Sequence, residues 1–407
     1  MTLGNPPPQP TLKSPTIKIL YSSWSDTILL TQTTPLEPPK LHYTGTTLTP
    51  TQTTHITSSV YLHSAFTTTN VNTTTVNFFG SAMHDGVRGY VISSSEEGGS
   101  DISRIVLFAT DTEMNAGEKE LHIYNVHADI EITNVKILSG GQVLFSTRAR
   151  GAACHDERML CLQSFEELRM YLGALDGVLE ESRMEVVASR VPVQWCTNAT
   201  TSVALMADAR VYTCTFDPRY PKCLGRSYDG SSKYKIVPFL SETQVVKIAS
   251  GGYLSAALGA DGEMYVWGQV CPGSAGKLAV LEDAMLLEGG ISARETGIDA
   301  EGEQDEFVKC LRVRIDGREA RVYDVAIGHG HVVVAAEVVG VGGRVRNRAV
   351  FAAGDNSRSQ LGVALRKEFI EEFEEITALR DERVTQLAAA GWSSHVVLHD
   401  NDIATQA

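Results

Sequence analysis

The chain has 407 residues, of which 43% are hydrophobic and 21% charged, and this composition is typical of a globular protein with one large repeat domain or two to three ordinary domains. Its formal net charge of −14 argues against broad, sequence-independent binding to DNA or RNA, which requires clustered Lys and Arg. Seven irregularly spaced cysteines form no C-x-x-C pair, so we expect reduced core thiols, no metal site and no cofactor.

The N-terminal residues 1–16 are rich in proline and lack the apolar core of a signal peptide. No run of about 18 apolar residues occurs, so the sequence predicts no membrane-spanning helix. We therefore expect a monomer that stays off membranes and lies in the cytoplasm, the nucleus or both.

The N-terminal part of the chain contains faint hairpin patterns. Residues 19–30 with 40–45, residues 58–66 with 76–80, and residues 102–114 with 120–125 each predict a small antiparallel unit. The Thr- and Pro-rich stretch 31–75 favours edge strands and loops. A clearer hairpin follows at 135–147, VKILSGGQVLFST.

Residues 164–181 predict an amphipathic helix inserted in a loop. Ser164 and Glu167 have capping-box spacing, and apolar residues then recur with a helical period. A second amphipathic helix is predicted over 367–383, with Phe369, Ile370, Phe373 and Ile376 on one face. Residues 289–306 are acidic, Gly-rich and without periodicity, which predicts a flexible loop.

The best-formed hairpin is residues 246–268, VKIASGGYLSAALGADGEMYVWG, with an Asp-Gly turn between two apolar runs. Its first seven residues match those from 135 at six positions, 111 residues earlier. Residues 193–215 follow the same template at an offset of 53, so that Ala204 and Tyr212 fall on Ala257 and Tyr265. Later copies are residues 324–335 with 349–354, and residues 387–398.

Short strands with turn signals, repeated along the chain, predict an all-β fold: a single β-propeller, with seven blades favoured and six to eight open. We place the propeller at 17–400, between the N-terminal segment 1–16 and a tail at 401–407. Insertions are expected near 163–185, 282–306 and 364–383.

Several motifs resemble the regulator of chromosome condensation (RCC) repeat. Residues 354–362, GDNSRSQLG, resemble the G-x-N-x-x-G-Q-L-G end of that repeat, and residues 261–268, DGEMYVWG, resemble its third strand. Gly328 to His331 supply G-x-x-H, His63-Ser64 supply H-S, and Leu3-Gly4-Asn5 resemble the end of a preceding repeat. The residues that carry the repeat signature are Gly251, Gly252, Asp261, Gly262, Tyr265, Trp267, Gly268, Gly328, His331, Gly354, Asn356, Gln360, Leu361 and Gly362.

The chain departs from the RCC pattern at three positions: Ser359 replaces a glycine, Leu254 replaces a histidine, and His395 lies one residue late. Propellers of this family close by pairing N-terminal with C-terminal strands, whereas the last hairpin here lacks outer strands. Two explanations remain open, a truncated start or an imperfectly closed ring.

Candidate chemical groups favour structural roles. In this repeat type a histidine such as His329 or His331 fixes the hairpin, and Asp355 and Asn356 are turn-formers. No nucleophile elbow, phosphate-binding loop or metalloprotease motif occurs, so we expect no catalysis. Trp24 and Trp392 follow the hairpin position of the repeat and are candidate anchors for a partner.

The sequence therefore predicts a non-catalytic scaffold that docks a protein partner through its blade loops. The resemblance implies an alternative, guanine-nucleotide exchange on a small GTPase, for which the acidic residues 299–306 are a candidate wedge. A second alternative is the fungal alpha-tubulin suppressor branch, which residues 24–30 resemble. Its members partner a small zinc protein in tRNA wobble-uridine and diphthamide modification.

Overall fold

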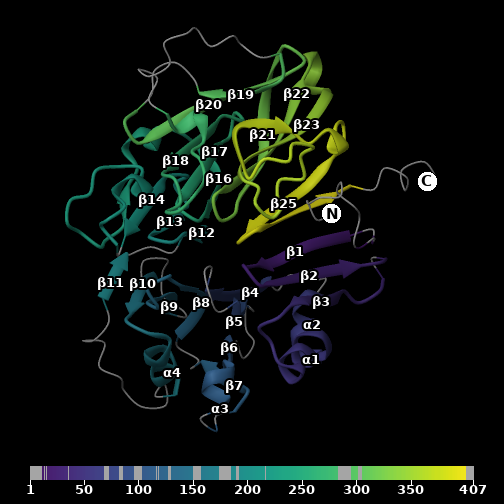
Figure 1. The fold of residues 1–407 in the computed structure, drawn as a ribbon. Coiled ribbons are helices and arrows are strands. Elements are labelled where there is room, and N and C mark those ends of the chain that lie inside the picture. The colour runs from purple at the N-terminus through teal and green to yellow at the C-terminus, as the bar shows by residue number, and fades with distance from the viewer. Residues whose placement is uncertain are drawn as a thin grey trace. The chain divides into compact units, whose positions relative to one another are not determined.

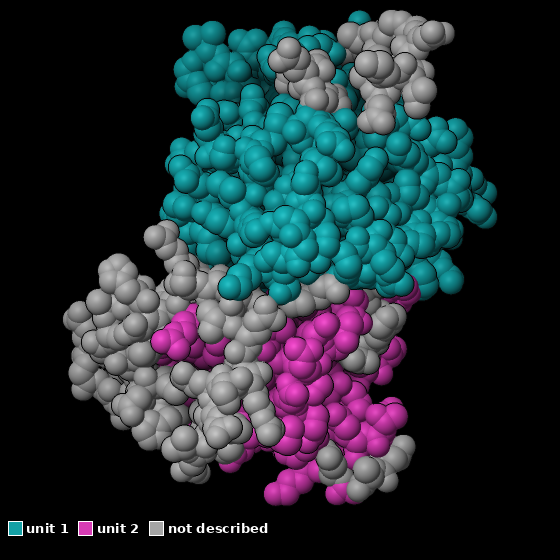
Figure 2. Space-filling model, turned by 90° about the vertical axis from the view of Figure 1, so that its left-hand side faces the viewer, with its two compact units in different colours: residues 1–13, 192–407 teal, residues 14–191 magenta. Residues whose placement is uncertain are grey.

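The computed structural model is all-β, with short helices between strands (Figure 1). It describes residues 12, 14, 16–34, 36–67, 73–81, 86–95, 103–115, 117, 119–126, 130–149, 157–173, 185–188, 192–215, 217–282, 295–300 and 305–399. The predicted Leu3-Gly4-Asn5 motif and the tail 401–407 lie outside these residues. Contacts divide the chain into two compact units, residues 14–191 and residues 192–407 with 1–13 (Figure 2).

The repeating element in both units is an antiparallel meander, in which each strand pairs with the next one along the chain, except that the strand at 264–268 pairs with the one at 308–315 and not with the intervening strand at 297–300. This is the blade pattern of a β-propeller, so the fold is all-β and of the propeller type. Over the described residues we count seven such meanders in succession when the nine-stranded sheet is divided at the turn after residue 315, where the flanking strands pair at only three positions. Whether they make seven blades of one ring stays a prediction.

Residues 14–191 contain the first three meanders. In the first two meanders the strands lie side by side in the order in which they follow one another along the chain. A single parallel bridge between Ser81 and Ile137 links the second meander to the third. The strands are β1 (Thr16–Ser22), β2 (Asp26–Gln32) and β3 (Lys40–Gly45); β4 (Thr73–Ser81), β5 (Gly86–Ser95), β6 (Ser103–Phe108) and β7 (Leu121–Val126); β8 (Ile130–Ile137), β9 (Val143–Ala149), β10 (Glu157–Leu162) and β11 (Glu185–Ala188).

The described residues of this unit include the helices α1 (Pro50–Ser58), α2 (Val60–Thr67), α3 (Asp111–Asn115) and α4 (Phe165–Gly173). The predicted helix at 164–181 is confirmed over α4, where the Ser164 hydroxyl accepts from the Glu167 amide at 3.2 Å. Residues 174–181 lie outside the described residues. Leu168 and Leu172 are buried in the core of the second and third meanders, as their spacing predicted.

The prediction that residues 58–66 form part of a hairpin, with His63-Ser64 as its motif, is wrong, because these residues are helical. Helix α1 begins with a capping box between Thr49 and Gln52. The hydroxyls of Thr54 and Thr57 donate hydrogen bonds to the backbone carbonyls four residues earlier. The capping box satisfies the first amides of α1, and Ile56 and Leu62 are buried against the first two meanders, so capping and packing stabilise helices in this Thr-rich stretch. The expectation of edge strands and loops over 31–75 therefore fails at α1 and α2.

Residues 192–399 contain the other four meanders, and the expected hairpins are confirmed here. The Ala204–Tyr212 pair of one meander corresponds to the Ala257–Tyr265 pair of the next, as the offset of 53 predicted. The strands are β12 (Gln194–Thr197), β13 (Thr201–Leu205), β14 (Val211–Thr215) and β15 (Lys235–Ile236); β16 (Val245–Gly251), β17 (Leu254–Gly259), β18 (Met264–Gly268), β19 (Gly297–Ala300) and β20 (Val308–Ile315); β21 (Arg318–Ile327), β22 (His331–Val339), β23 (Val345–Asp355) and β24 (Phe369–Glu375); β25 (Val384–Ala390) and β26 (Ser393–Leu398).

The short 3-10 helices of this unit follow or connect these strands: η2 (Pro221–Leu224), η3 (Pro238–Leu240), η4 (Ala279–Leu281), η6 (Val341–Gly343) and η7 (Thr377–Leu379).

The predicted helix at 367–383 is wrong: its core is strand β24, followed by η7. Phe373 is buried against the preceding meander, whereas Ile370 and Ile376 are buried against the following one. Because both faces of this strand are covered, its apolar residues do not alternate with polar ones, and the resulting spacing imitates a helix.

The predicted flexible loop at 289–306 is wrong at residues 297–300, which form strand β19 and pair with β20. Ile298 is buried in the core there. Residues 289–294 and 301–304 lie outside the described residues. Residues 297–300 are too few to show a periodic pattern, so this strand is recognised only through its pairing with the next strand along the chain.

A buried carboxylate joins three meanders of this unit. Asp324, on β21, forms an ion pair with Lys247 of β16 and accepts the Leu387 amide of β25 at 2.7 Å. Such contacts fix neighbouring meanders against one another and hold the loops at their ends in place.

Candidate protein-interaction surface

Hairpin tips of the four meanders in residues 192–399 touch one another. The Ala199 amide donates to the Gly252 carbonyl at 2.8 Å, and the His329 amide donates to the Gly391 carbonyl at 2.8 Å. A Cβ on Gly252 would lie 2.9 Å from the Gly330 nitrogen, so the second and third tips are also in contact. The tips are residues 199–200, 252–253, 329–330 and 391–392.

The loops after the third strands return to these tips. Gln269, after β18, donates its amide to the Tyr253 carbonyl at 3.0 Å, and Asp355, at the end of β23, donates to the Gly330 carbonyl at 2.9 Å. The Cys223 thiol donates to the Tyr253 carbonyl at 3.3 Å. We call the four tips together with residues 217–226, 269–278 and 355–368 the tip surface.

Gly251 shows why the repeat has glycine beside a tip. A Cβ built on it would lie 2.4 Å from the Ile327 carbonyl oxygen of the next meander. Backbone atoms cannot move aside as a flexible side chain can, so a larger residue would push the two hairpins apart.

His331 joins two meanders from inside the protein. Its Nε2 lies 2.9 Å from the Ser394 hydroxyl of β26, and its side chain has no solvent exposure. Burial lowers the pKa of His331 to about 4, because the charged imidazolium would lose its hydration. The imidazole is therefore neutral near pH 7. Its partner Ser394 is at the position where the sequence template predicts a histidine, which in this chain is residue 395.

The loop at 354–362 is folded by its own polar side chains. Asn356 donates from Nδ2 to the carbonyls of Leu365 and Lys367, at 3.3 and 3.1 Å, and accepts the Leu361 amide at 3.2 Å. Gln360 donates to the Asp355 carboxylate at 3.1 Å and accepts the amide of Arg358 at 2.9 Å. These bonds hold the loop that carries the exposed Arg358.

The other signature residues lie in packed positions. Trp267 is fully buried, and its Nε1 donates to the Cys223 carbonyl at 3.2 Å, while Tyr265 packs into the same core. Asp261 and Gly262 form the β17–β18 turn, where Gly262 has φ +93° and lies against Arg321. This turn lies at the opposite end of β17 from the tip surface.

Trp392 is the most exposed aromatic group of the hairpin tips. It is 36% exposed, and the Arg358 guanidinium lies 5.2 Å from its ring centroid. A similar arrangement occurs at the second tip, where Tyr220 and Tyr253 meet at 4.9 Å and Arg219 lies 5.6 Å from the Tyr220 ring. Aromatic side chains with arginine are the groups that contribute most binding energy at protein interfaces.

Trp24, the other sequence candidate, is in the β1–β2 turn and is only partly exposed. It belongs to residues 14–191. Arg358, Tyr220 and Tyr253 were not among the candidates predicted from the sequence. Tyr253 could have been found, since it directly follows the Gly-Gly of the best-formed hairpin, but nothing local distinguishes Arg358 from other surface arginines.

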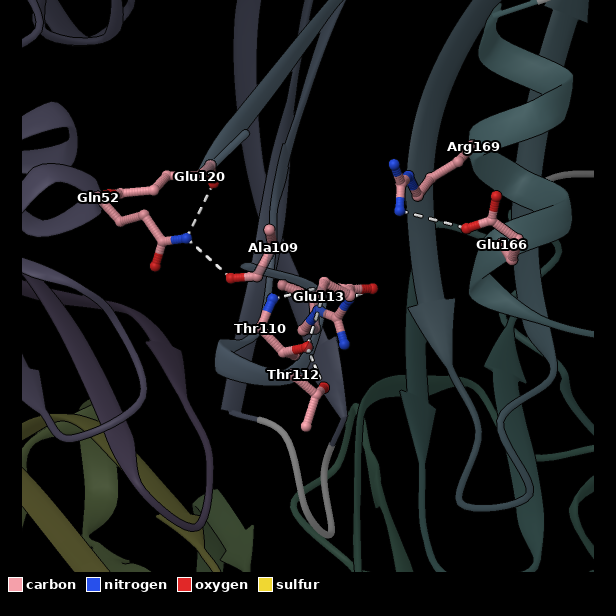
Figure 3. A network of polar contacts seen from close by, with 9 residues as sticks. Gln52, Ala109, Thr110, Thr112, Glu113, Glu120, Glu166 and Arg169 are labelled. Carbon is pink, nitrogen blue, oxygen red and sulfur yellow. Dashed lines mark hydrogen bonds and ion pairs between the residues drawn. The ribbon is translucent and has the colours of Figure 1, made fainter. Parts of the chain in front are cut away.

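A second polar network, in residues 14–191, has a structural explanation (Figure 3). Glu113 accepts two bonds from Arg88, at 3.0 and 3.1 Å, and one from the Thr110 hydroxyl, while Gln52 donates to the carbonyls of Ala109 and Glu120. Burial raises the pKa of Glu113, but hydrogen bonds from Thr110 and the charge of Arg88 outweigh it, so the pKa is lowered. Each of these groups has a protein partner, and none points to a substrate.

Within the described residues no group of three or more His, Cys, Asp or Glu side chains could hold a metal ion. In the same part of the chain, no helix has the length and apolar character that a membrane span needs.

No protein-family model matches the sequence, and no curated protein does either. Similar solved structures include Prp20p from Saccharomyces cerevisiae, with 14% identity, a TM-score of 0.43, and coverage of 78% of this chain and 69% of that one. Human WBSCR16 has 14% identity and a TM-score of 0.36, with 77% and 85% covered. The β-propeller domain of Myceliophteria thermophila Cps50 has 10% identity and a TM-score of 0.28, with 64% and 66% covered.

Proposed function

We propose that this protein is a non-catalytic interaction scaffold, a diverged relative of the RCC-type propellers, that docks a protein partner on its tip surface. The observation that carries the proposal is the exposed Trp392–Arg358 pair on a tip fixed by backbone bonds. A rigid aromatic anchor loses little conformational entropy on binding, so it is suited to an interface. The repeat motifs of the sequence support the relationship to the family.

Replacing Trp392 by alanine tests the proposal. We expect the variant to lose about 2 kcal/mol of binding free energy, the typical contribution of a buried aromatic anchor. The measurement is affinity purification of the full chain with quantitative mass spectrometry, followed by titration of the purified partner. Partner recovery should fall in W392A.

Phe239→Ala provides the matched control, because Phe239 is 37% exposed and lies beside Tyr265, at the other end of the meander. A partner that binds wild type, W392A and F239A equally well would show that docking takes place elsewhere.

Guanine-nucleotide exchange on a small GTPase is the second candidate function. It is supported by the resemblance of the sequence to exchange factors of the RCC type. Prp20p is described as binding Gsp1p and histones. Nucleotide release from a panel of purified GTPases separates the two functions, since a scaffold leaves every intrinsic release rate unchanged.

The suppressor-branch alternative predicts a different partner. A small zinc protein of tRNA wobble-uridine or diphthamide modification should then co-purify in stoichiometric amount. Its absence beside another stoichiometric partner would remove this alternative.

A further inference from the structure

We propose that the tip surface binds an acidic, extended segment of its partner, with Arg358 as the central contact. This inference rests on the proposed function and adds the chemistry of the partner. It follows from the charges that the tip surface leaves exposed.

Three cations lie together on the loop after β23. Arg358, Arg366 and Lys367 are all exposed, and Asn356 fixes the backbone on both sides by bonding to the carbonyls of Leu365 and Lys367. In the described part of the chain, none of the three forms an ion pair. The loop therefore presents fixed positive charge to solvent.

The acidic groups nearby are mostly occupied. The Asp355 carboxylate accepts the Ser357 amide at 2.8 Å and the Gln360 amide group at 3.1 Å. Asp217 binds Arg219 through two contacts, at 2.8 and 2.7 Å, and the hydrogen bond from Arg219 lowers the pKa of Asp217. On the loop after β23, the exposed Glu368 is outnumbered by the three cations.

The exposed guanidinium group of Arg358 can bind a carboxylate. The Arg358 guanidinium carbon lies 5.2 Å from the Trp392 ring centroid, which is within the range of a cation–π contact. A guanidinium edge binds a carboxylate through two parallel hydrogen bonds, and such charge-assisted bonds are about twice as strong as neutral ones. Asp and Glu side chains fit this contact.

The next tip extends the site. Lys222 is exposed on η2, whose Cys223 is bonded to Tyr253, and the Tyr253 tip touches the His329–Gly330 tip. An extended segment can therefore lie across neighbouring tips, with carboxylates at the cations and apolar groups at the aromatic rings. The net charge of −14 repels an acidic partner from the rest of the chain and directs it to this surface.

Charge also favours a peptide over a nucleic acid. Duplex DNA carries one phosphate charge for about every 1.7 Å of its axis, so it needs a long row of cations to neutralise it. The tip surface offers a small cluster on an acidic protein, which suits a few carboxylates.

Fluorescence anisotropy with a labelled glutamate-rich peptide tests this inference on the full chain. We expect saturable binding that weakens as salt rises, and a loss of about tenfold in affinity, or about 1.4 kcal/mol, for Arg358→Glu. Arg366→Glu should weaken binding in the same direction. The matched control is Arg318→Glu, the same charge change on an exposed residue at the far end of β21, which should leave affinity unchanged.

Three outcomes would overturn the inference: no binding of the peptide by the folded wild-type chain, equal loss in R358E and R318E, or tighter binding of labelled single-stranded DNA. Thermal unfolding checks that each variant is folded. A partner that W392A loses but R358E retains would keep the proposed function and reject the acidic segment.

Discussion

Ser359 has a backbone conformation that its side chain disfavours. Its φ of +58° lies in the left-handed region, where the RCC repeat has glycine. The loop bonds around it, including Ser359 N–H to the Asn356 carbonyl at 2.8 Å, hold this conformation.

Replacing Ser359 by glycine should stabilise the protein by about 0.5–1 kcal/mol, because removal of the Cβ strain outweighs the extra entropy of the unfolded chain. Urea unfolding measures the change. Ser357→Gly is the control, since Ser357 is exposed and has no positive φ, and it should not stabilise. If S359G were less stable than the wild type, the contacts of the Ser359 side chain would stabilise the folded protein by more than the strain of its positive φ destabilises it.

The buried His331 predicts a loss of stability in acid. In the unfolded chain the histidine pKa is about 6.5, so that state binds a proton first as the pH falls. The folded pKa of about 4 keeps the native imidazole neutral. Stability is therefore full above about pH 6.5 and falls as the pH drops towards 4.

Between about pH 7.5 and pH 5 this group alone should cost about 2 kcal/mol of unfolding free energy. The measurement is denaturant unfolding across this range in wild type and in His331→Gln, in which the slope should be smaller. His399→Gln, at an exposed position, should keep the wild-type slope. Burial also lowers the pKa of His395 to about 4, so part of the slope will remain in H331Q.

At the scale of elements, contacts between neighbouring meanders decide which residues fit. Strand β24 became a strand because both of its faces are covered, although its residues have a helical spacing. Helices α1 and α2 formed where Thr-rich sequence favoured strands, because a capping box starts α1 and because Ile56 and Leu62 are buried against neighbouring strands.

Gly251 is the element-scale test of the tip-to-tip contact. We expect Gly251→Val to destabilise the protein by about 3 kcal/mol, because its side chain would overlap the Ile327 carbonyl of the next meander. Thermal and urea unfolding give the magnitude. Gly173→Ala, where a Cβ would meet nothing within 4 Å, should change stability little. Unchanged unfolding of G251V would contradict the close contact.

At the scale of the whole molecule, the described residues contain seven successive meanders, and the number of blades stays a prediction. We predict that they close into one ring, which would make residues 17–400 a single domain. Calorimetry should then show one transition with equal calorimetric and van't Hoff enthalpies. Two separate transitions, for residues 14–191 and 192–407, would contradict a single propeller.

The sequence by itself determined the hairpins whose turns and pairings are local. Residues 246–268 carry the Gly-Gly, the Asp-Gly turn and the alternating strands within 23 positions, so the template could be found in its copies. The Ser164 cap of helix α4 was local for the same reason. Trp24 and Trp392 could be named as candidates from their position beside the turn.

Only the tertiary structure decided the features that depend on distant residues. Strand β24 exists through the two meanders that cover it. The pair of Arg358 with Trp392 joins a loop of one meander to the tip of the next, 34 residues apart (392 − 358). The local sequence cannot predict such contacts, because they stabilise the protein only when separate meanders pack together.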